Sequence, residues 1–371
     1  MVSMHSLHFF SWTDQLKEAG YEVYWFDILD FGKEVEKLNW THQIYNWKKK
    51  VNYPGRTFLK HKFPKLYRLV NKYNDNRIDK AFEKKLLEIQ PDIVHSFAMQ
   101  LSCIPILEVM QKYPKIKWMY SSWGSDMFFS DYLKIEKSKM TEALQRIDCL
   151  ITDCQRDYKI AVEKGFNNKF LGVFPGNGGV NFDQLTTDVE RNIILIKGYN
   201  LKVGRGLQII KALTDEIIPL IQNYQIIIYG ADQALMDYVN AEQRFSNLNL
   251  KAFTNRQFIT NTELLGYMSK AYLHIANSAS DGLPNSLIEA MGMGAFPIQS
   301  NPGNVTTELI EHQKNGLLIS NPDDVSEIIS HLKYVFAHPE MVEEARTYNQ
   351  VFIKERYNRM SLKSKITQLY D

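Results

Sequence analysis

Strand-like and helix-like segments alternate along the whole chain. Short apolar, β-branched runs are each followed by a loop and then by a stretch whose apolar residues recur at helical spacing. The predicted strands cover residues 21–28, 93–95, 117–121, 149–152, 170–174, 192–196, 225–229, 249–253, 272–276 and 295–298. This alternation is typical of α/β domains built on parallel sheets, and we predict that fold class here.

The chain is long enough for two domains. It has 371 residues, and 44% of them are hydrophobic, so two cores of ordinary size are available. The glycine-rich turn at residues 175–181 is the expected boundary between them. We therefore expect one Rossmann-like domain over residues 1–180, a second over residues 181–347, and a final helical segment over residues 348–371.

The N-terminus departs from the expected pattern. A doubly wound domain normally begins with a strand, but the opening letters MVSMHSLH lead directly into an amphipathic stretch over residues 6–19. We expect the first strand to be absent, either because the true start lies upstream or because the sheet is built differently. A strand at residues 1–3 that pairs in the middle of the sheet would contradict this expectation.

Composition narrows the classes of function. The net charge is +2, which gives no global signal for nucleic-acid binding. No apolar run reaches about 18 residues, so we expect no membrane-spanning helix, and we also expect no secretory leader. The three cysteines, an odd count without a framework pattern, favour a reducing cytoplasm. Cys149 and Cys154 could be metal ligands, but we expect buried free thiols because no further ligand is suitably spaced.

The segment DGLPNSLIEAMGMG, residues 281–294, carries the most specific chemistry. It lies between two predicted strands, with Pro284 suited to the first turn of a helix and Gly294 to its C-terminal cap. The free N–H groups at a helix start bind anions. Asp281 and Glu289 flank that start, and Glu289 lies roughly 7.5 Å along the helix axis from Pro284. This layout suits a nucleotide diphosphate sugar, which has a diphosphate between two sugars.

At these residues the chain resembles the family 4 retaining glycosyltransferases of the GT-B fold. Their donor signature is a glutamate, seven intervening residues and a second glutamate, and here Asp281 and Glu289 occupy the two positions. The letters GLPN and EAM also match, as does ELIEHQKNGLLI at residues 308–319. The resemblance implies two domains facing each other across a cleft, with the acceptor in the first and the donor mainly in the second. It also implies that residues 348–371 cross back onto the first domain.

The donor roles follow from the residues and the resemblance together. A carboxylate such as Glu289 accepts hydrogen bonds from the two ribose hydroxyls, and the resemblance implies the same role. Asp281, one methylene shorter than the usual glutamate, would hold hydroxyls of the transferred sugar. Residues 253–255 either supply a pocket for the base, with UDP-sugars favoured over GDP-sugars, or form an ordinary loop. The loop residues expected to contact phosphate or sugar oxygens are Gly282, Leu283, Pro284 and Asn285.

We expect no metal at this site. Many sugar transferases hold a divalent ion with Asp-x-Asp, but no two aspartates here are separated by one residue. The charge of the diphosphate would then be neutralised by cations and helix dipoles. Lys197 and Arg205, on the loop that joins a strand to a helix, are the candidates; the alternative is a solvated loop. Arg205 matches the family's lysine position, and Lys197 lies near its arginine position.

The first half of the chain offers acceptor-side candidates. The segment WGSDMFF follows a strand and resembles the family's loop near the reacting centre, where His-Gly-x-Asp is common; here Trp123 replaces the histidine and Asp126 matches the aspartate. Asp126 either orients the acceptor or a sugar hydroxyl, or it caps a helix. His95 is either catalytic or structural. His5 and His8 lie where the first loop of the domain is expected and are further acceptor-site candidates.

The expected function is sugar transfer with retention of anomeric configuration to a glycan or lipid-linked glycan, in cell-surface polysaccharide synthesis. In the resembling family the leaving phosphate helps to deprotonate the acceptor, so the protein supplies positioning and charge stabilisation rather than a nucleophile. Two alternatives stay open. One is a nucleotide-sugar epimerase of similar fold, and the other is a non-catalytic nucleotide-sugar-binding protein on a decayed transferase scaffold.

Residues 47–73 are cationic and aromatic without any acidic residue. This composition suits an anionic membrane surface at the inner face of the cell membrane, where a lipid-linked acceptor would be presented. A solvated loop and, as a weaker option, a site for single-stranded nucleic acid are the alternatives. The cations are Lys48, Lys49, Lys50, Arg56, Lys60, Lys62, Lys65, Arg68 and Lys72, interleaved with Trp47, Tyr53, Phe58, Phe63, Tyr67 and Tyr73.

Overall fold

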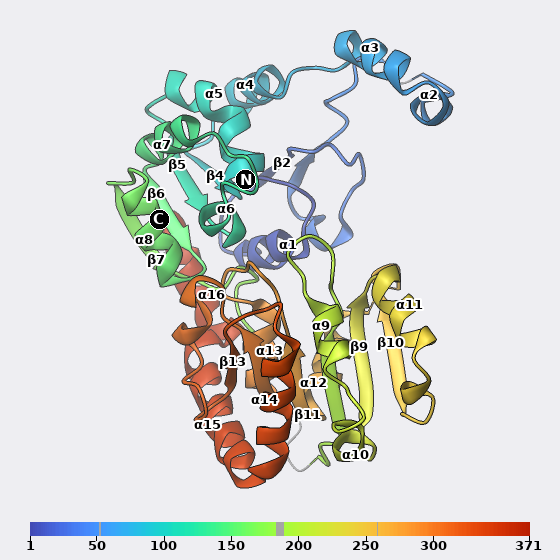
Figure 1. Cartoon of the computed structure of the whole chain (residues 1–371). Helices are drawn as coiled ribbons and strands as arrows, with labels where there is room; N and C mark the ends of the chain where they lie inside the picture. The colour runs from blue at the N-terminus through green and yellow to red at the C-terminus, as the bar shows by residue number, and fades with distance from the viewer. Residues whose placement is uncertain (52, 183–188, 258) are drawn as a thin grey trace. The chain divides into compact units, whose positions relative to one another are not determined.

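The structure is a computed structural model that describes residues 1–51, 53–182, 189–257 and 259–371. Residue 52, inside the cationic segment, and residues 183–188, just after the expected domain boundary, lie outside the described residues, as does residue 258. The contacts divide the chain into two compact units (Figure 1). The first comprises Met1–Asp153, Asp157–Asn177 and Lys365–Asp371, and the second comprises Cys154–Arg156 and Gly178–Ser364.

The first unit is built on a seven-stranded parallel sheet in the order β3-β2-β1-β4-β5-β6-β7. Its strands are β1 Val2–Ser3, β2 Tyr24–Asp27, β3 His42–Ile44, β4 Ile93–Phe97, β5 Lys117–Ser121, β6 Cys149–Thr152 and β7 Lys169–Val173. Its helices are α1 Leu7–Thr13, α2 Arg56–Lys62, α3 Pro64–Asn74, α4 Ile78–Ile89, α5 Leu107–Lys112, α6 Ser125–Phe128, α7 Lys137–Arg146 and α8 Gln155–Glu163, the last of which begins in the second unit.

The second unit is built on a six-stranded parallel sheet in the order β10-β9-β8-β11-β12-β13. Its strands are β8 Ile193–Lys197, β9 Gln225–Ala231, β10 Leu250–Thr254, β11 Ala271–Ala276, β12 Phe296–Ser300 and β13 Leu317–Ile319. Its helices are α9 Gly206–Lys211, α10 Ile218–Ile221, α11 Gln233–Ala241, α12 Asn261–Ser269, α13 Asn285–Gly292, α14 Val325–Ala337, α15 Pro339–Tyr357 and α16 Arg359–Thr367, which ends in the first unit.

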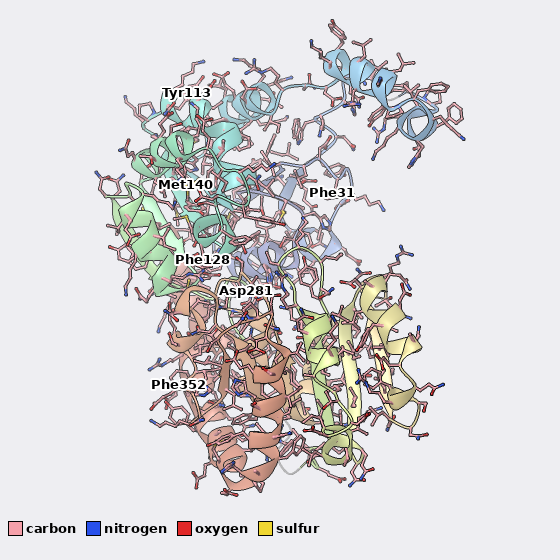
Figure 2. The ribbon with its side chains drawn as sticks, viewed as in Figure 1. Phe31, Tyr113, Phe128, Met140, Asp281 and Phe352 are labelled. Carbon is pink, nitrogen blue, oxygen red and sulfur yellow. The ribbon has the colours of Figure 1, made fainter. Side chains whose placement is uncertain are left out.

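Helices cover both faces of the second sheet, which explains its continuous apolar strands. All six residues of β11 are buried, as expected for a parallel sheet with two covered faces. One hydrophobic cluster joins this sheet to α9, α11 and α14, and another joins it to α12 and α13. A third cluster forms the core of the first unit and includes Met140, labelled in Figure 2. The predicted α/β fold with parallel sheets is therefore confirmed.

The expected absence of the first strand is wrong. β1 lies in the middle of its sheet, between β2 and β4, and Val2 pairs with Phe26 on one side and Ser96 on the other. The Phe26 N–H donates to the Met1 carbonyl at 2.9 Å. The strand escaped prediction because it has only two residues, one of them polar, and so leaves no apolar run in the sequence. Its neighbours, rather than its own composition, hold it in the sheet.

The C-terminal segment continues as helix, with a break at Asn358 between α15 and α16. Residue 348, where the third segment was expected to start, lies inside α15. Within the first unit, the Trp12 indole donates to the Tyr370 hydroxyl at 2.9 Å, and the Tyr21 hydroxyl donates to the Thr367 carbonyl at 3.0 Å. In the part of the chain that the structure describes, no helix combines the length and apolar character needed to cross a membrane.

Candidate functional site

The topology of the second sheet creates a place for a ligand. β8 and β11 are neighbours in the middle of the sheet, but the chain leaves β8 toward β9 and leaves β11 toward β12. Loops at such a switch point diverge at the carboxyl ends of the strands and leave a crevice for ligands. Here the two loops are hydrogen-bonded to each other, because the Arg205 N–H donates to the Asn277 carbonyl at 2.9 Å and Ala279 N–H to the Val203 carbonyl at 2.8 Å.

Helix α13 starts from the second of these loops. Pro284 is its N-cap residue, one position earlier than the predicted first turn, and Asn285 is its first helical residue. Gly294 has φ of +87°, the left-handed conformation typical of the residue after a helix. The first turn of an α-helix leaves N–H groups without intrahelical acceptors, and these can bind an anion. The start of α13 thus faces the same end of the sheet as the β8 loop.

Glu289 is a buried carboxylate on α13. It is 8% exposed, and its Oε1 accepts a hydrogen bond from the Asn261 amide of α12 at 3.1 Å. Burying a carboxylate is unfavourable unless it has partners, so Asn261 helps to hold the charge in place. No local motif indicates Asn261 as the partner, because helices α12 and α13 meet only in the folded unit.

Asp281 and Lys197 lie near each other at the carboxyl end of the sheet, and Figure 2 labels Asp281 at that end of the second unit. Burial raises the pKa of the Asp281 carboxyl, while the Lys197 ammonium, the Gly282 N–H and the Arg156 guanidinium act in the opposite direction. Lys197 is the last residue of β8, which places it at the switch point of the sheet. The structure therefore brings these two predicted site residues together.

Arg205 is engaged by a neighbour that the sequence did not suggest. Its guanidinium Nε donates to the Asp323 carboxylate at 2.6 Å, and Nη1 donates to the Gly204 carbonyl at 3.0 Å. The side chain of Arg205 is 27% exposed and that of Asp323 is 59% exposed. A diphosphate bound by Arg205 would thus compete with a partly solvated ion pair. No contact between Arg205 and Glu289 is found among the described residues.

Arg156 is a third cation near these loops, and sequence reasoning missed it. It belongs to the second unit, and its guanidinium donates to the Asp281 carbonyl and to the Pro302 carbonyl, both at 2.8 Å. Its own backbone N–H donates to the Glu308 carboxylate at 3.1 Å. Arg156 thereby fixes the loops that follow β11 and β12. Arg156 lies far from both loops in the sequence. No local motif therefore indicates its role, which only the folded structure reveals.

A polar pair lies beneath the same region of the sheet. The Tyr229 hydroxyl on β9 and Nε2 of His274 on β11 share a hydrogen bond of 2.9 Å. Burial, helped by the positive charge of Lys197, lowers the pKa of His274 to about 3, and burial raises the pKa of Tyr229. The histidine is therefore neutral at physiological pH. The sequence feature that could have indicated this pair is Tyr229, the last residue of the predicted strand 225–229, which lies beside Lys197 in the sheet register.

The predicted pocket for the base begins at the end of β10, an edge strand of the sheet. Phe253 is partly exposed there, with its ring 5.8 Å from the Tyr267 ring and 4.6 Å from the Lys251 ammonium. The Asn255 N–H donates to the Ala231 carbonyl at 2.8 Å. The two rings are tilted by 48° to each other, so they form an angled aromatic pair on the same unit as the candidate donor-site loops.

Asp126, in the first unit, is held by its own surroundings. It is 5% exposed, and its carboxylate accepts hydrogen bonds from the Met99 N–H at 2.8 Å, the Trp123 N–H at 2.9 Å and the Tyr120 hydroxyl at 2.5 Å. Burial raises the pKa of the Asp126 carboxyl. The side chain joins the start of α6 to the turn after β4. Asp126 is the second residue of α6, whose N-cap is Gly124, so it does not cap the helix; its bonds instead hold the loop before α6 against the turn after β4.

His95 is also surrounded by protein. It is 1% exposed; its Nδ1 lies 2.7 Å from the Tyr370 hydroxyl and its Nε2 lies 2.8 Å from the Ser121 hydroxyl. Burial lowers the pKa of His95 well below its ordinary value, so the ring is neutral. With both nitrogens engaged, the ring matches the structural alternative given for this residue.

The loop after β1 and the first turn of α1 carry the more accessible candidates, His5 and His8 respectively. His5 and His8 are exposed, and the His8 ring lies 6.2 Å from the ring of Trp123 in the loop after β5. The His5 ring packs edge-on against Phe10 at 4.6 Å. β1 and β4 form the switch point of the first sheet, since the chain leaves them in opposite directions. The two histidines and Trp123 are therefore placed where a ligand of the first unit is expected.

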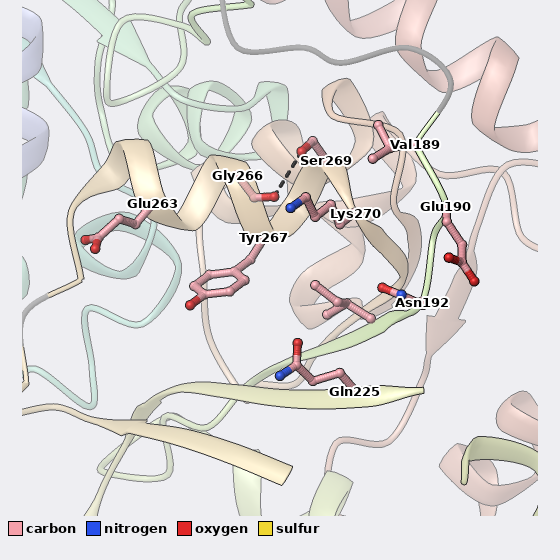
Figure 3. A pocket seen from close by; sticks show the side chains of 10 residues that line it. Val189, Glu190, Asn192, Gln225, Glu263, Gly266, Tyr267, Ser269 and Lys270 are labelled. Carbon is pink, nitrogen blue, oxygen red and sulfur yellow. Dashed lines mark hydrogen bonds between the residues drawn. The ribbon is translucent and has the colours of Figure 1, made fainter. Parts of the chain in front are cut away.

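A pocket of about 590 Å³ lies elsewhere on the second unit (Figure 3). Asn192 and Gln225 line it at the amino ends of β8 and β9, and Tyr267 and Lys270 line it from α12 and just beyond. The candidate donor residues follow the carboxyl ends of the strands. This pocket is therefore at the opposite end of the sheet from them.

The two parallel-sheet units have the fold of the GT-B glycosyltransferases. Residues 202–338 match the family described as Glycosyl transferases group 1, which confirms the resemblance drawn from the donor signature. The matched segment contains Arg205, Asp281 and Glu289. No curated protein matches the chain.

Solved structures support the same fold at low sequence identity. A sucrose-phosphate synthase from Thermosynechococcus elongatus has a TM-score of 0.71 and 16% identity, covering 100% of this chain and 98% of that one. HepE from Anabaena, in complex with UDP-glucose, has a TM-score of 0.66 and 12% identity, with the same shares covered. A TarM mutant from S. aureus, in complex with UDP and other ligands, has a TM-score of 0.60 and 14% identity, covering 79% of this chain and 59% of that one.

Proposed function

We propose that the protein is a retaining, metal-independent glycosyltransferase that uses a nucleotide diphosphate sugar, with UDP-sugars preferred over GDP-sugars. The acceptor is a glycan or a lipid-linked glycan in cell-surface polysaccharide synthesis. The observation that carries the proposal is the convergence of Lys197, Asp281 and the start of α13 at the switch point of the second sheet. Similar structures that hold UDP or UDP-glucose support the choice of uridine.

Each part of the donor has a residue in this scheme. Glu289 accepts hydrogen bonds from the ribose hydroxyls, and its buried, Asn261-bound position favours a fixed geometry. The start of α13, with Lys197 and Arg205, stabilises the charge of the diphosphate as it becomes the leaving group. Asp281 binds hydroxyls of the transferred sugar. Its raised pKa is compatible with a carboxyl that hydrogen-bonds in either protonation state.

The reaction breaks the bond between the anomeric carbon and the phosphate oxygen and forms a bond from that carbon to the acceptor oxygen. The acceptor proton passes to a phosphate oxygen on the same face of the sugar, so no protein nucleophile is needed. The protein contributes orientation and charge stabilisation. We assign positioning roles to Asp126 and His95, because both are hydrogen-bonded within the first unit.

The test is to incubate the purified protein with a UDP-sugar and EDTA and to follow the sugar by proton NMR. Slow hydrolysis that first releases the same anomer as in the donor supports the proposal. An epimerised but intact nucleotide sugar would identify an epimerase. An intact donor that binds tightly would identify a binding protein. A cytoplasmic location at the inner face of the membrane is part of the proposal, supported by three buried free cysteines.

A further inference from the structure

Helices α2 and α3 form a hairpin that takes no part in the core of the first unit. Neither helix contains a buried residue. Figure 1 shows the pair joined to the rest of the unit by extended segments. The structure around it is well packed: Trp47, where one segment begins, is 9% exposed and donates to the Asp27 carbonyl at 2.8 Å. We call residues 56–74 the α2–α3 hairpin.

The base of the hairpin is held by specific bonds. Lys49 forms an ion pair with Asp75 and donates to the Asn71 amide oxygen at 2.9 Å. The Asn74 side chain donates to the Val51 carbonyl at 2.8 Å and accepts from the Val51 N–H at 3.0 Å. The Lys50 N–H donates to the Asn74 carbonyl at 2.9 Å. These bonds close the base of the hairpin, and the Lys48 N–H, which donates to the Asp30 carboxylate at 2.9 Å, attaches that base to the rest of the first unit.

Helix α3 has three different faces. At 100° per residue, its partly buried residues, which include Tyr67 and Asn71, lie together on the side toward the base. A second face carries Leu66, Leu69 and Tyr73, which are 48%, 55% and 69% exposed. The third face carries the cations Lys65, Arg68 and Lys72. The apolar face therefore points away from the protein and lies beside a cationic face.

The turn between the helices extends the apolar surface. Phe58 on α2 is 61% exposed and Phe63 between the helices is 54% exposed, with their rings 6.1 Å apart. Five large apolar side chains in one short hairpin thus face solvent. Contiguous exposed apolar patches are uncommon on soluble monomeric proteins, and they usually mark a site that binds a partner.

The charge around this apolar surface has one sign. Residues 47–73 carry nine lysines and arginines and no aspartate or glutamate. Within the described part of the chain, Lys49 alone among these nine has an ion pair, with Asp75 outside the segment. The other eight have no ion pair among the described residues, although the Lys50 ammonium donates to the Tyr73 carbonyl at 2.9 Å.

We propose that the α2–α3 hairpin binds an anionic lipid bilayer, with Phe58, Phe63, Leu66 and Leu69 entering the interface and the cations contacting lipid headgroups. An apolar face flanked by lysine and arginine is the pattern of helices that lie in a membrane interface. Each cation near an anionic surface is expected to strengthen binding about fivefold at low salt. A polyanion such as single-stranded nucleic acid would use the cations but not the aliphatic face, and so fits less well.

Vesicle sedimentation tests the proposal with the full chain. We expect binding to vesicles of phosphatidylcholine with about a quarter phosphatidylglycerol, weak binding to phosphatidylcholine alone, and at least a tenfold loss between about 0.1 and 0.5 M salt. The variant K62Q/K65Q/R68Q/K72Q and, separately, F58S/L66S/L69S should each lose at least tenfold. The matched control K115Q/K134Q/K137Q/K159Q removes four cations from elsewhere on the first unit and should bind like wild type.

A dye attached to a new cysteine reports the depth of contact. The three native cysteines are buried, so Leu69→Cys can be labelled selectively with an environment-sensitive fluorophore. The emission should shift to the blue on addition of anionic vesicles, whereas a label at Lys134→Cys should not respond. Absence of vesicle binding, equal loss in the control, or tighter binding to a single-stranded oligonucleotide without a dye shift would overturn the proposal. None of these outcomes bears on donor binding.

Discussion

At the scale of single residues, the charges of the candidate donor site are held by partners from distant parts of the second unit. Glu289 is bound by Asn261, Arg205 by Asp323, and the loop of Asp281 by Arg156. The carboxylates and cations were visible in the sequence, but their partners were not, because each pair joins two different elements. These partners decide how readily each charge can meet a ligand.

Replacing Glu289 with glutamine tests its contact with the ribose. The charged acceptor is lost while size and packing are kept, so we expect the dissociation constant for UDP to rise about 10- to 100-fold. Calorimetric titration of the variant against wild type measures this. Glu311→Gln, an exposed carboxylate elsewhere on the unit, is the control and should bind UDP normally. An unchanged affinity in the Glu289 variant would remove this residue from the donor site.

The ion pair between Arg205 and Asp323 predicts a gain of affinity. Asp323→Asn frees the guanidinium for the diphosphate, so KM for the donor should fall about two- to fivefold, a range typical of releasing a solvent-exposed pair. Arg205→Ala should raise KM about tenfold or more. Steady-state kinetics of the variants would measure both changes in KM. The control is Asp215→Asn, which changes an exposed residue remote from this pair and should leave KM unaltered. If Asp323→Asn weakens the donor instead, the pair is needed to shape the loop.

His95 makes stability depend on pH. Its folded pKa is depressed by burial, whereas the unfolded side chain has an ordinary pKa near 6.5. Below that pH the unfolded state binds a proton that the folded state does not, so stability falls by up to about 1.4 kcal/mol per pH unit. Urea unfolding at a series of pH values between about 6.5 and 5 should show a smaller slope for His95→Gln than for wild type. Equal slopes would mean that His95 is protonated in the folded unit.

At the scale of elements, predictions succeeded where a strand is buried on both faces and long enough to leave an apolar run. The central residues of β8, β9, β11 and β12 were all predicted correctly from the sequence. The short strands β1 Val2–Ser3, β3 His42–Ile44 and β13 Leu317–Ile319 were missed. β3 is an edge strand without a buried residue, and β1 has two residues, so tertiary pairing rather than local composition fixes them.

The junction of β8 and α9 requires glycine. A Cβ on Gly206 would lie 2.7 and 2.8 Å from backbone carbon and oxygen of Gly198, which cannot move independently of the loop. Gly206→Ala should therefore destabilise the protein by about 1–3 kcal/mol, measured by denaturant unfolding. Gly266→Ala, in α12, meets nothing within 4 Å and should instead stabilise by about 0.5–1 kcal/mol. Equal stability of the two variants would contradict this packing argument.

At the scale of the whole molecule, the two units differ in how far the sequence predicts their sites. The donor signature is local, since Asp281, Pro284 and Glu289 lie within nine consecutive residues, 281–289. This explains why the family could be named from one segment. In the first unit, His95 meets Tyr370, 275 positions away, so only folding reveals that its ring is engaged. From the sequence alone, a histidine at the end of a strand is equally consistent with a catalytic and a structural role.

The central claim is that the loops after β8 and β11 bind a nucleotide diphosphate without a metal. A crystal structure of the protein with UDP in the presence of EDTA tests it most directly. We predict the ribose hydroxyls within hydrogen-bonding distance of Glu289 and the diphosphate at the start of α13, near Lys197. A nucleotide bound elsewhere, or one that appears only when a divalent ion is added, would contradict the account.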